Sequence, residues 1–330
     1  MIIETRELRK SYDSRTGRQR TRVEAVAGLD LGVKEGEIFG LLGPNGAGKT
    51  TTLHMLATLI APDSGEAFID GLDLTGSPRE VRRRIGYVAQ HGSTGDDVTG
   101  REELVMQARM YGYPKAEAAR RADRLIADFG LAEYADRRCR TYSGGQRRRV
   151  DIALGVIHGP RIVLLDEPSS GLDPAGRAVL WDEIRRLRAA GTTIVLTTHY
   201  LDEADALCDR ITIVDHGQVI ADGTPEELKA QVAGDVVVIG LGRDGSAATA
   251  RALLTGSRGV ERVEDAQDNA LRLFVDRGAS AIPQIMHTLD AAGLEIATLT
   301  LHQPSLDDVF LAKTGRSLRV VAEPAEGAEA

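Results

Sequence analysis

Cysteine is scarce in this sequence of 330 residues, and its scarcity excludes a class of protein. The only two cysteines are Cys139 and Cys208, which lie far apart and have no histidine or cysteine neighbours at metal-ligand spacing. A disulfide-stapled secreted domain needs several closely spaced pairs, and a zinc site needs clustered ligands. We therefore expect reduced thiols in a cytosolic protein, and we propose no metal site from these cysteines.

Long apolar runs are also missing. No window of the sequence approaches the roughly 18 uninterrupted apolar residues of a membrane-spanning helix. Residues 1–7 lack the apolar core of a signal peptide. We therefore expect a chain that neither enters nor crosses a bilayer by itself.

An excess of positive charge is absent as well. Aspartate and glutamate number 49 against 41 lysines and arginines, which gives a formal net charge of -8 at pH 7. This balance argues against a protein whose main partner is nucleic acid. Arginine does cluster at residues 82–84 and 147–149, and each cluster is predicted to be a solvated helix face. With 42% hydrophobic and 27% charged residues, the chain is expected to form two globular domains.

The most informative stretch is Gly43–Thr50, with the sequence Gly-Pro-Asn-Gly-Ala-Gly-Lys-Thr between an apolar run and a helix-like segment. Its three glycines allow the backbone to curl closely around a phosphate with the N–H groups pointing inward. The partial positive charge of the helix that begins near Lys49 adds to this attraction. This pattern predicts a phosphate-binding P-loop, in which Lys49 contacts the β- and γ-phosphates and Thr50 binds Mg²⁺.

A second strand is predicted to end in carboxylates. Residues 162–165 form a continuous apolar run, typical of a buried parallel strand, and Asp166 and Glu167 follow it directly. In P-loop enzymes an acid at this place holds Mg²⁺, a role that suits Asp166. Glu167 is then placed to take a proton from the water that attacks the γ-phosphate. Buried carboxylates without a cation would be costly, which disfavours a purely structural role.

Two polar side chains follow other predicted strands. Gln90 comes after the short strand 85–89, where it is a candidate to meet Mg²⁺ or the attacking water. His199 follows the strand 194–197. Because the carboxyl ends of parallel strands meet at one edge of a sheet, both are candidate members of the nucleotide site.

Tyr12 ends the first predicted strand, residues 2–12. A polar, basic loop at 13–22 is expected to connect it to a strand at 26–33. The Tyr12 ring either stacks on a nucleotide base or is a half-buried surface tyrosine, and the sequence does not decide between the two.

A second glycine-rich helix start lies at Ser143–Gln146, ahead of a predicted helix at 147–157. It forms another anion-binding terminus by the same argument as the P-loop. Residues 101–135 have helical periodicity and predict a helical subdomain inserted before it. Two phosphate-binding helix ends in one chain imply that a nucleotide is shared between two chains.

Taken together, these motifs resemble the ATP-binding cassette (ABC) ATPases. The order typical of that family is present over about residues 1–228: P-loop, Gln90, the signature Tyr142–Gln146, Asp166-Glu167, the loop Ser170–Asp173 and the switch histidine His199. A signature shortly before an acidic strand is highly specific. The sequence departs from the pattern at Tyr142, where the family most often has leucine, and in the long basic loop after Tyr12.

The resemblance implies an α/β fold: a P-loop ABC ATPase core at residues 1–228 with an antiparallel β subdomain and an inserted helical subdomain at about 92–158. It implies ATP and Mg²⁺ as ligands, and a homodimer in which each P-loop faces the signature of the other chain. The implied nucleotide-binding residues are Tyr12, Gly43, Pro44, Asn45, Gly46, Ala47, Gly48, Lys49, Thr50, Thr51, Ser143, Gly144, Gly145 and Asp173. The implied metal ligands are Thr50, Gln90 and Asp166, and the implied catalytic residues are Glu167, His199 and Gln90.

The remaining residues are predicted to form a small α+β domain at 229–316. Strand, helix, strand, strand, helix and strand are expected between 236 and 301, which is a ferredoxin-like order. A helix that starts at Pro304 or Ser305 follows. This ending looks like that of exporter ATPases of the daunorubicin/doxorubicin-resistance type. Residues 323–330 are small and acidic, and a disordered tail is expected at 317–330.

The resemblance therefore implies the ATP-hydrolysing subunit of an exporter. It would power a separately encoded integral membrane permease as a peripheral protein on the cytoplasmic face of the membrane. Efflux of an amphipathic drug or antibiotic is the favoured function, and export of a lipid or a surface polymer is the alternative.

Two other functions are less well supported. A soluble ABC ATPase that acts on DNA or ribosomes usually has a long coiled-coil insertion or two cassettes in one chain, and the sequence shows neither. A P-loop GTPase would need an Asn-Lys-x-Asp motif to recognise guanine. Asn45 and Asn269 are the only asparagines, and neither belongs to such a motif.

Overall fold

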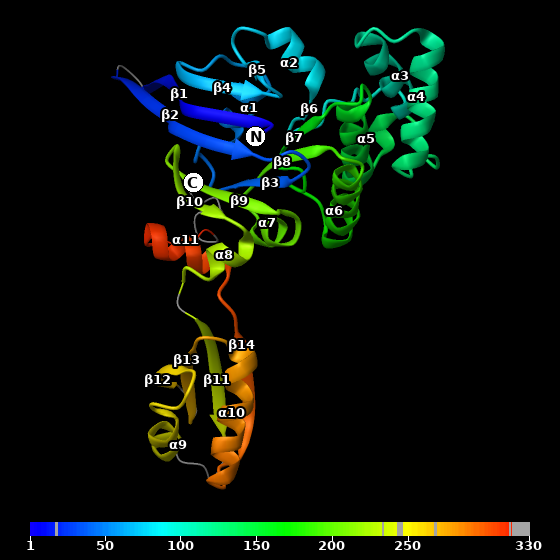
Figure 1. Cartoon of the computed structure of the whole chain (residues 1–330). Coiled ribbons are helices and arrows are strands. Elements are labelled where there is room, and N and C mark those ends of the chain that lie inside the picture. The colour runs from blue at the N-terminus through cyan, green and yellow to red at the C-terminus, as the bar shows by residue number, and fades with distance from the viewer. Residues whose placement is uncertain (17–18, 233, 243–246, 267–268, 317, 319–330) are drawn as a thin grey trace, which may run out of the picture. The chain divides into compact units, whose positions relative to one another are not determined.

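The computed structural model describes residues 1–16, 19–232, 234–242, 247–266, 269–316 and 318 (Figure 1). The chain divides into two compact units, one containing Met1–Pro225 and the other Glu226–Ser317. In the described parts of the chain, no helix combines the length and the apolar character that crossing a membrane requires. The predicted disordered tail, 317–330, lies outside the described residues except for Leu318.

A six-stranded sheet forms the centre of the first unit. Its order is β10-β9-β3-β8-β7-β6, and all neighbours are parallel except the β9–β10 pair. The strands are β3 (Ile38–Leu42), β6 (Ile85–Val88), β7 (Ile162–Asp166), β8 (Thr193–Thr198), β9 (Arg210–Asp215) and β10 (Gln218–Gly223). Every residue of β3, β7 and β8 is buried, which explains the apolar runs 38–42, 162–165 and 194–196 within them. Because these strands are parallel, the residues that follow them meet at one edge of the sheet.

A four-stranded antiparallel sheet, with the order β2-β1-β4-β5, completes the strands of this unit. It contains β1 (Ile3–Thr16), β2 (Gln19–Val33), β4 (Ser64–Ile69) and β5 (Leu72–Asp73). The predicted loop at 13–22 is wrong, because β1 and β2 stay paired as far as Thr16 and Gln19. The polar sequence permits this pairing, since an antiparallel ribbon can face water and satisfies its backbone groups across the ladder.

Helices α3 (Gly100–Met110) and α4 (Lys115–Asp128) occupy the segment with helical periodicity. Figure 1 shows them side by side at one flank of the first unit, with the antiparallel sheet at the other. Thr99 and Glu102 form a reciprocal capping box that fixes the start of α3. The other helices before Pro225 are α1 (Lys49–Leu56), α2 (Pro78–Arg84), α5 (Gly144–Val156), α6 (Pro174–Ala189) and α7 (Leu201–Leu207).

Helix α5 differs from the prediction at its arginines. The cluster Arg147–Arg149 is not simply a solvated face, because Arg148 is only 6% exposed. All residues of α5 from Val150 to Val156 are also buried, so this part of the helix lies inside the unit, while its start lies at the surface. Charge counting along the sequence cannot detect this, since the burial depends on the segments that pack around the helix.

The second unit has its own sheet and its own apolar core. Strands β11 (Asp235–Leu241), β12 (Val260–Ala266), β13 (Ala270–Val275) and β14 (Ile296–His302) pair antiparallel in the order β12-β13-β11-β14. Buried residues of β11 and β13 pack with those of α9 (Ala247–Leu254) and α10 (Gly278–Ala291). This arrangement confirms the predicted ferredoxin-like fold. Helix α8 (Pro225–Lys229) precedes the sheet, and α11 (Leu306–Thr314), capped by Ser305, follows it.

Candidate functional site

The predicted P-loop connects β3 to the start of α1. At the N-cap of α1, Gly48 has φ +99°, and a Cβ placed there would lie 2.2 Å from the carbonyl oxygen of Ala25. Only glycine fits this position. No side chain caps α1, so its start can offer backbone N–H groups to an anion. Asn45 and Gly46 line the cleft in front of this helix.

Lys49 is the cation of this cleft, and it is only 4% exposed. Its Nζ donates to the carbonyl oxygens of Gly43 at 2.8 Å and Pro44 at 3.0 Å, and lies 3.6 Å from Oε1 of Glu167. Burial lowers the pKa of Lys49, while the neighbouring carboxylates oppose that shift. The predicted residue Ala47 is buried and supports the loop, since its N–H donates to the carbonyl oxygen of Pro44.

Two oxygen-bearing side chains lie next to each other where the end of β7 meets the start of α1. Oδ1 of Asp166 accepts a hydrogen bond from Oγ1 of Thr50 at 3.0 Å, and another from Oγ1 of Thr197 at 2.6 Å. A hydroxyl and a carboxylate at this separation form a donor set of the kind that Mg²⁺ prefers. The described residues contain no group of three or more histidine, cysteine or acidic side chains that could hold a metal ion.

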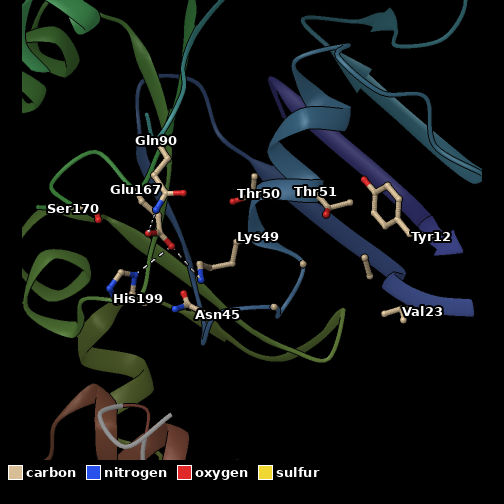
Figure 2. A pocket seen from close by; sticks show the side chains of 13 residues that line it. Tyr12, Val23, Asn45, Lys49, Thr50, Thr51, Gln90, Glu167, Ser170 and His199 are labelled. Carbon is tan, nitrogen blue, oxygen red and sulfur yellow. Dashed lines mark hydrogen bonds and ion pairs between the residues drawn. The ribbon is translucent and has the colours of Figure 1, made fainter. Parts of the chain in front are cut away.

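Glu167 is the point at which the predicted catalytic residues meet (Figure 2). Nε2 of Gln90 donates to its Oε2 at 2.9 Å, and Nδ1 of His199 lies 3.2 Å from its Oε1. Burial alone would raise the pKa of Glu167, but His199 and Lys49 outweigh it and hold the pKa below the ordinary value. The side chain is therefore an ionised, 7% exposed carboxylate, which can accept a proton from a water in the cleft.

The backbone also holds Glu167 in an unusual conformation. Its φ is +41°, a region that side-chain-bearing residues rarely adopt. Its N–H points at Thr197 of the neighbouring strand, 3.0 Å from Oγ1 and 3.2 Å from the carbonyl oxygen. Strained conformations of this kind persist only when the surrounding structure fixes them, and they are frequent at active sites.

The cleft has a volume of about 650 Å³. Figure 2 shows Tyr12 and Val23 on one side of the P-loop and Glu167, His199 and Gln90 on the other. Tyr12 is 43% exposed, so the space beside its ring is accessible to a flat ligand. Thr51 lines the same cleft, as does Ser170 from the predicted loop Ser170–Asp173. Two further lining residues, Val23 and Ala25, were not identified from the sequence. Val23 could have been found from the hairpin register, because it pairs directly with Tyr12.

The other predicted nucleotide-binding residues line a second cleft of about 460 Å³. Ser143, Gly144 and Gly145 form the start of α5, where Ser143 and Gln146 cap the helix reciprocally. Asp173 also lies here, and its Oδ1 accepts from the N–H of Gly176 at 2.7 Å as the N-cap of α6. The structure therefore places the predicted site residues in two separate clefts of the first unit.

Profiles of known protein families match parts of both units. The profile of the ABC transporter family matches residues 26–170. A second profile, described as the C-terminal domain of DrrA1-3-like ATP-binding proteins, matches residues 223–314.

Curated relatives match nearly the whole chain. The daunorubicin/doxorubicin resistance ATP-binding protein DrrA of Streptomyces peucetius is 46% identical over 95% of this chain and 92% of its own length. The Nod factor export ATP-binding protein I of Ralstonia nicotianae is 38% identical over 96% of this chain and 95% of its own. The linearmycin resistance ATP-binding protein LnrL of Bacillus subtilis is 32% identical over 96% of this chain and all of its own.

Solved structures match the first part of the fold. An ATP-binding subunit of an ABC transporter has a TM-score of 0.60 at 29% identity and covers 70% of this chain and 93% of its own. A dimeric ATP-binding cassette in a post-hydrolysis state, bound to ADP and Pi, has a TM-score of 0.61 at 26% identity. It covers 67% of this chain and 98% of its own.

Proposed function

The chain belongs to the ABC transporter family as an ATP-binding protein, and from this premise we propose that it is the ATP-hydrolysing subunit of an exporter. It powers a separately encoded integral membrane permease from the cytoplasmic face of the membrane. The observation that carries this proposal is the Glu167 cluster, in which a carboxylate, a buried lysine, a histidine and a glutamine surround the space in front of the P-loop.

ATP fits the first cleft in one orientation. The phosphates contact the start of α1 and Lys49, whose Nζ exchanges its present carbonyl partners for phosphate oxygens. The adenine ring of the ATP lies towards Tyr12 and Val23, at the opposite end of the cleft from Glu167. Tyr12 lines the P-loop cleft, which favours the stacking interpretation over that of a half-buried surface tyrosine.

Mg²⁺ fits the oxygen pair of Thr50 and Asp166, with Gln90 as the third predicted ligand. When bound there, it would neutralise charge on the β- and γ-phosphates. In the present geometry the amide nitrogen of Gln90 donates to Glu167, so ligation of the metal would require Gln90 to present its amide oxygen instead.

Hydrolysis follows from the position of Glu167. Its ionised carboxylate accepts a proton from the water that attacks the γ-phosphate, while His199 contacts the γ-phosphate from the other side of the carboxylate. Lys49 compensates the charge of the phosphates. These residues act without forming a covalent bond to the substrate, so their contribution lies in positioning and electrostatics.

Two chains form each complete site in this proposal. Ser143, Gly144 and Gly145 line a cleft separate from the P-loop cleft, so they are available to the ATP of a second chain. The structural similarity to a dimeric cassette bound to ADP and Pi supports this arrangement. The resulting homodimer would close on ATP and open after hydrolysis.

Efflux of a drug or antibiotic is the cargo function that the relatives support best. Two relatives are named for resistance to daunorubicin/doxorubicin and to linearmycin. A relative of similar coverage is named for Nod factor export, which keeps export of a lipid or surface polymer as the alternative. The formal net charge of -8 gives no support for nucleic acid as a partner.

Co-purification tests the exporter proposal. The tagged chain is isolated from membranes of its native host, and accompanying proteins are identified by mass spectrometry. Retention of one polytopic membrane protein, and ATP hydrolysis that rises when a candidate drug is added, are the expected results. A chain that stays in the soluble fraction and brings down ribosomes or nucleic acid would contradict it.

A further inference from the structure

Arg148 lies near the start of α5, and its guanidinium is hydrogen-bonded to two separate chain segments, one at residues 166–168 and one at Ala89. Nε donates to the carbonyl oxygen of Pro168 at 2.8 Å, and Nη2 to that of Asp166 at 3.0 Å. Nη1 donates to the carbonyl oxygen of Ala89. All three acceptors are main-chain atoms, so the contacts fix backbone positions rather than side chains.

These three carbonyls belong to residues that flank Glu167 and Gln90 along the chain. Asp166 and Pro168 are the residues on either side of Glu167, and Ala89 precedes Gln90. The side chains of Gln90 and Glu167 are hydrogen-bonded to each other at 2.9 Å. One guanidinium therefore holds the backbone beneath both partners of that bond, together with the strained φ of Glu167.

Packing alone does not account for an arginine at this position. Burying a guanidinium is costly, and apolar residues of similar volume often stabilise such a site better. Burial indeed lowers the pKa of Arg148. Within the described chain, none of the ion pairs closer than 4 Å involves Arg148, so the main-chain carbonyls provide its close contacts. The planar guanidinium offers five N–H donors in fixed directions, which lets one side chain set the spacing of several segments.

Helix α5 is attached to the same region by two further contacts. Oδ1 of the buried Asp151 accepts from the N–H of Ser93, just beyond Gln90. Gly86 of β6 approaches α5 so closely that a Cβ there would lie 2.1 Å from the carbonyl oxygen of Gly155. The helix that begins at the Ser143–Gly145 start is thus fixed against β6 and the segment that carries Gln90.

We propose that Arg148 is a positioning residue for Glu167, which connects the start of α5 to the backbone on both sides of that carboxylate. The proposal rests on the proposed function, since it assumes that Glu167 is the base. It adds that the helix whose first residues serve the ATP of the second chain also determines the placement of the base in its own chain.

Arg148→Lys and Arg147→Lys form a matched pair that tests this proposal. Lysine keeps the charge but cannot span three carbonyls, whereas Arg147 contacts Asp96 and the carbonyl oxygen of Cys139, away from Glu167. For Arg148→Lys we expect kcat for ATP to fall roughly 10- to 100-fold while KM changes less than about threefold, because a small misplacement of a catalytic group has effects of that size. Arg147→Lys should keep the wild-type kcat. A wild-type kcat in Arg148→Lys would overturn the proposal.

A double-mutant cycle with Glu167→Gln separates positioning from a general structural role. If Arg148 acts through Glu167, adding Arg148→Lys to Glu167→Gln should lower single-turnover hydrolysis less than about twofold further, since coupled residues are not additive. An equal loss in both backgrounds would overturn the proposal. Should Arg148→Lys fail to fold, Arg148→Gln, which keeps two N–H donors without the charge, decides the same cycle.

The outcomes also separate this proposal from the proposed function. If Glu167→Gln loses hydrolysis and Arg148→Lys keeps the wild-type kcat, only the proposed positioning role of Arg148 is contradicted. Wild-type hydrolysis in Glu167→Gln removes the catalytic assignment itself.

Discussion

Helices α1 and α5 of the first unit both have glycine-rich starts that line a cleft, and the surroundings of the two starts differ. Helix α1 starts at Gly48 without a side-chain cap and has the cation Lys49 and the carboxylate Glu167 beside it. Helix α5 starts at Ser143, which caps it reciprocally with Gln146. Among the described residues that line the cleft at α5, the one carboxylate is Asp173, and it caps α6. The two glycine-rich helix starts therefore differ in the charged side chains that surround them.

Because of this difference, we expect the hydrolysis of ATP to take place at the start of α1 and not at the start of α5. The start of α1 combines uncapped N–H groups with the cation Lys49, the proposed base Glu167 and the candidate Mg²⁺ ligands. The start of α5 offers donors and a helix dipole but no base. A single chain therefore holds two unlike halves, and in the proposed function they become complete sites only when two chains meet.

Replacing Glu167, the proposed general base, should have the largest effect on ATP hydrolysis. Glu167→Gln keeps the size of the side chain but removes proton acceptance, so steady-state ATP hydrolysis should fall about 10²- to 10⁴-fold. ATP affinity should stay within a few-fold of wild type, because Lys49 and the start of α1 are untouched. Hydrolysis is measured by phosphate release and affinity by equilibrium binding. Wild-type turnover in this variant would contradict the role of Glu167.

The two helix starts should respond in opposite ways to a new side chain. A Cβ at Gly145 meets nothing within 4 Å, so Gly145→Asp should fold, and its carboxylate suits a helix N-terminus. It would repel the phosphates of a second chain's ATP, and we expect turnover to fall roughly 100-fold, the size of losing a key donor at an active site.

The matched change Gly48→Ala should instead lower the melting temperature, because its Cβ would collide with Ala25. Thermal unfolding and phosphate release on both variants give the comparison. Unchanged turnover in Gly145→Asp would mean that α5 does not serve a nucleotide.

Replacing Lys49 should weaken the binding of ATP itself at the start of α1. Lys49→Ala removes a charged donor to the phosphates, and hydrogen bonds to charged groups are worth about 1.5–3 kcal/mol, so Kd for ATP should rise roughly 10- to 100-fold. Lys34→Ala is the control, since Lys34 is an exposed lysine of the same unit outside the cleft. Equal ATP affinity in Lys49→Ala and wild type would count against the P-loop assignment.

Tyr12 should give the smallest effect. Aromatic contacts contribute about 0.5–1.5 kcal/mol, so Tyr12→Ala should raise Kd for ATP about 3- to 10-fold, while Tyr12→Phe, which keeps the ring, should match wild type. Equal affinities of all three proteins would make Tyr12 a surface residue. Kd for inorganic triphosphate, which has no base, should not respond to either change.

The sequence predicts the parts of this molecule that depend on local pattern. The P-loop and the strand before Asp166 and Glu167 are encoded in glycine spacing and in a continuous apolar run, and the structure has them at the expected residues. The ferredoxin-like order of the second unit follows from alternating strands and helices. Those features need no knowledge of distant neighbours.

Other features depend on tertiary contacts and escaped prediction. The β1–β2 hairpin extends to Thr16 and Gln19 because pairing, not an apolar face, satisfies its backbone. Burial of Arg148 depends on Ala89, Asp166 and Pro168, which lie up to 59 residues away in the chain. The bond between Gln90 and Glu167 likewise joins two loops that only the folded sheet brings together.

The molar mass of the Glu167→Gln chain with and without ATP tests the central claim most directly. Light scattering on the purified chain should report one chain without nucleotide and two chains with Mg²⁺ and ATP, because hydrolysis no longer reopens the closed pair. Adding Gly145→Asp should restore the mass of one chain. A chain that binds ATP at saturating concentration and still keeps the mass of one chain would contradict a site shared between the start of α1 in one chain and the start of α5 in another.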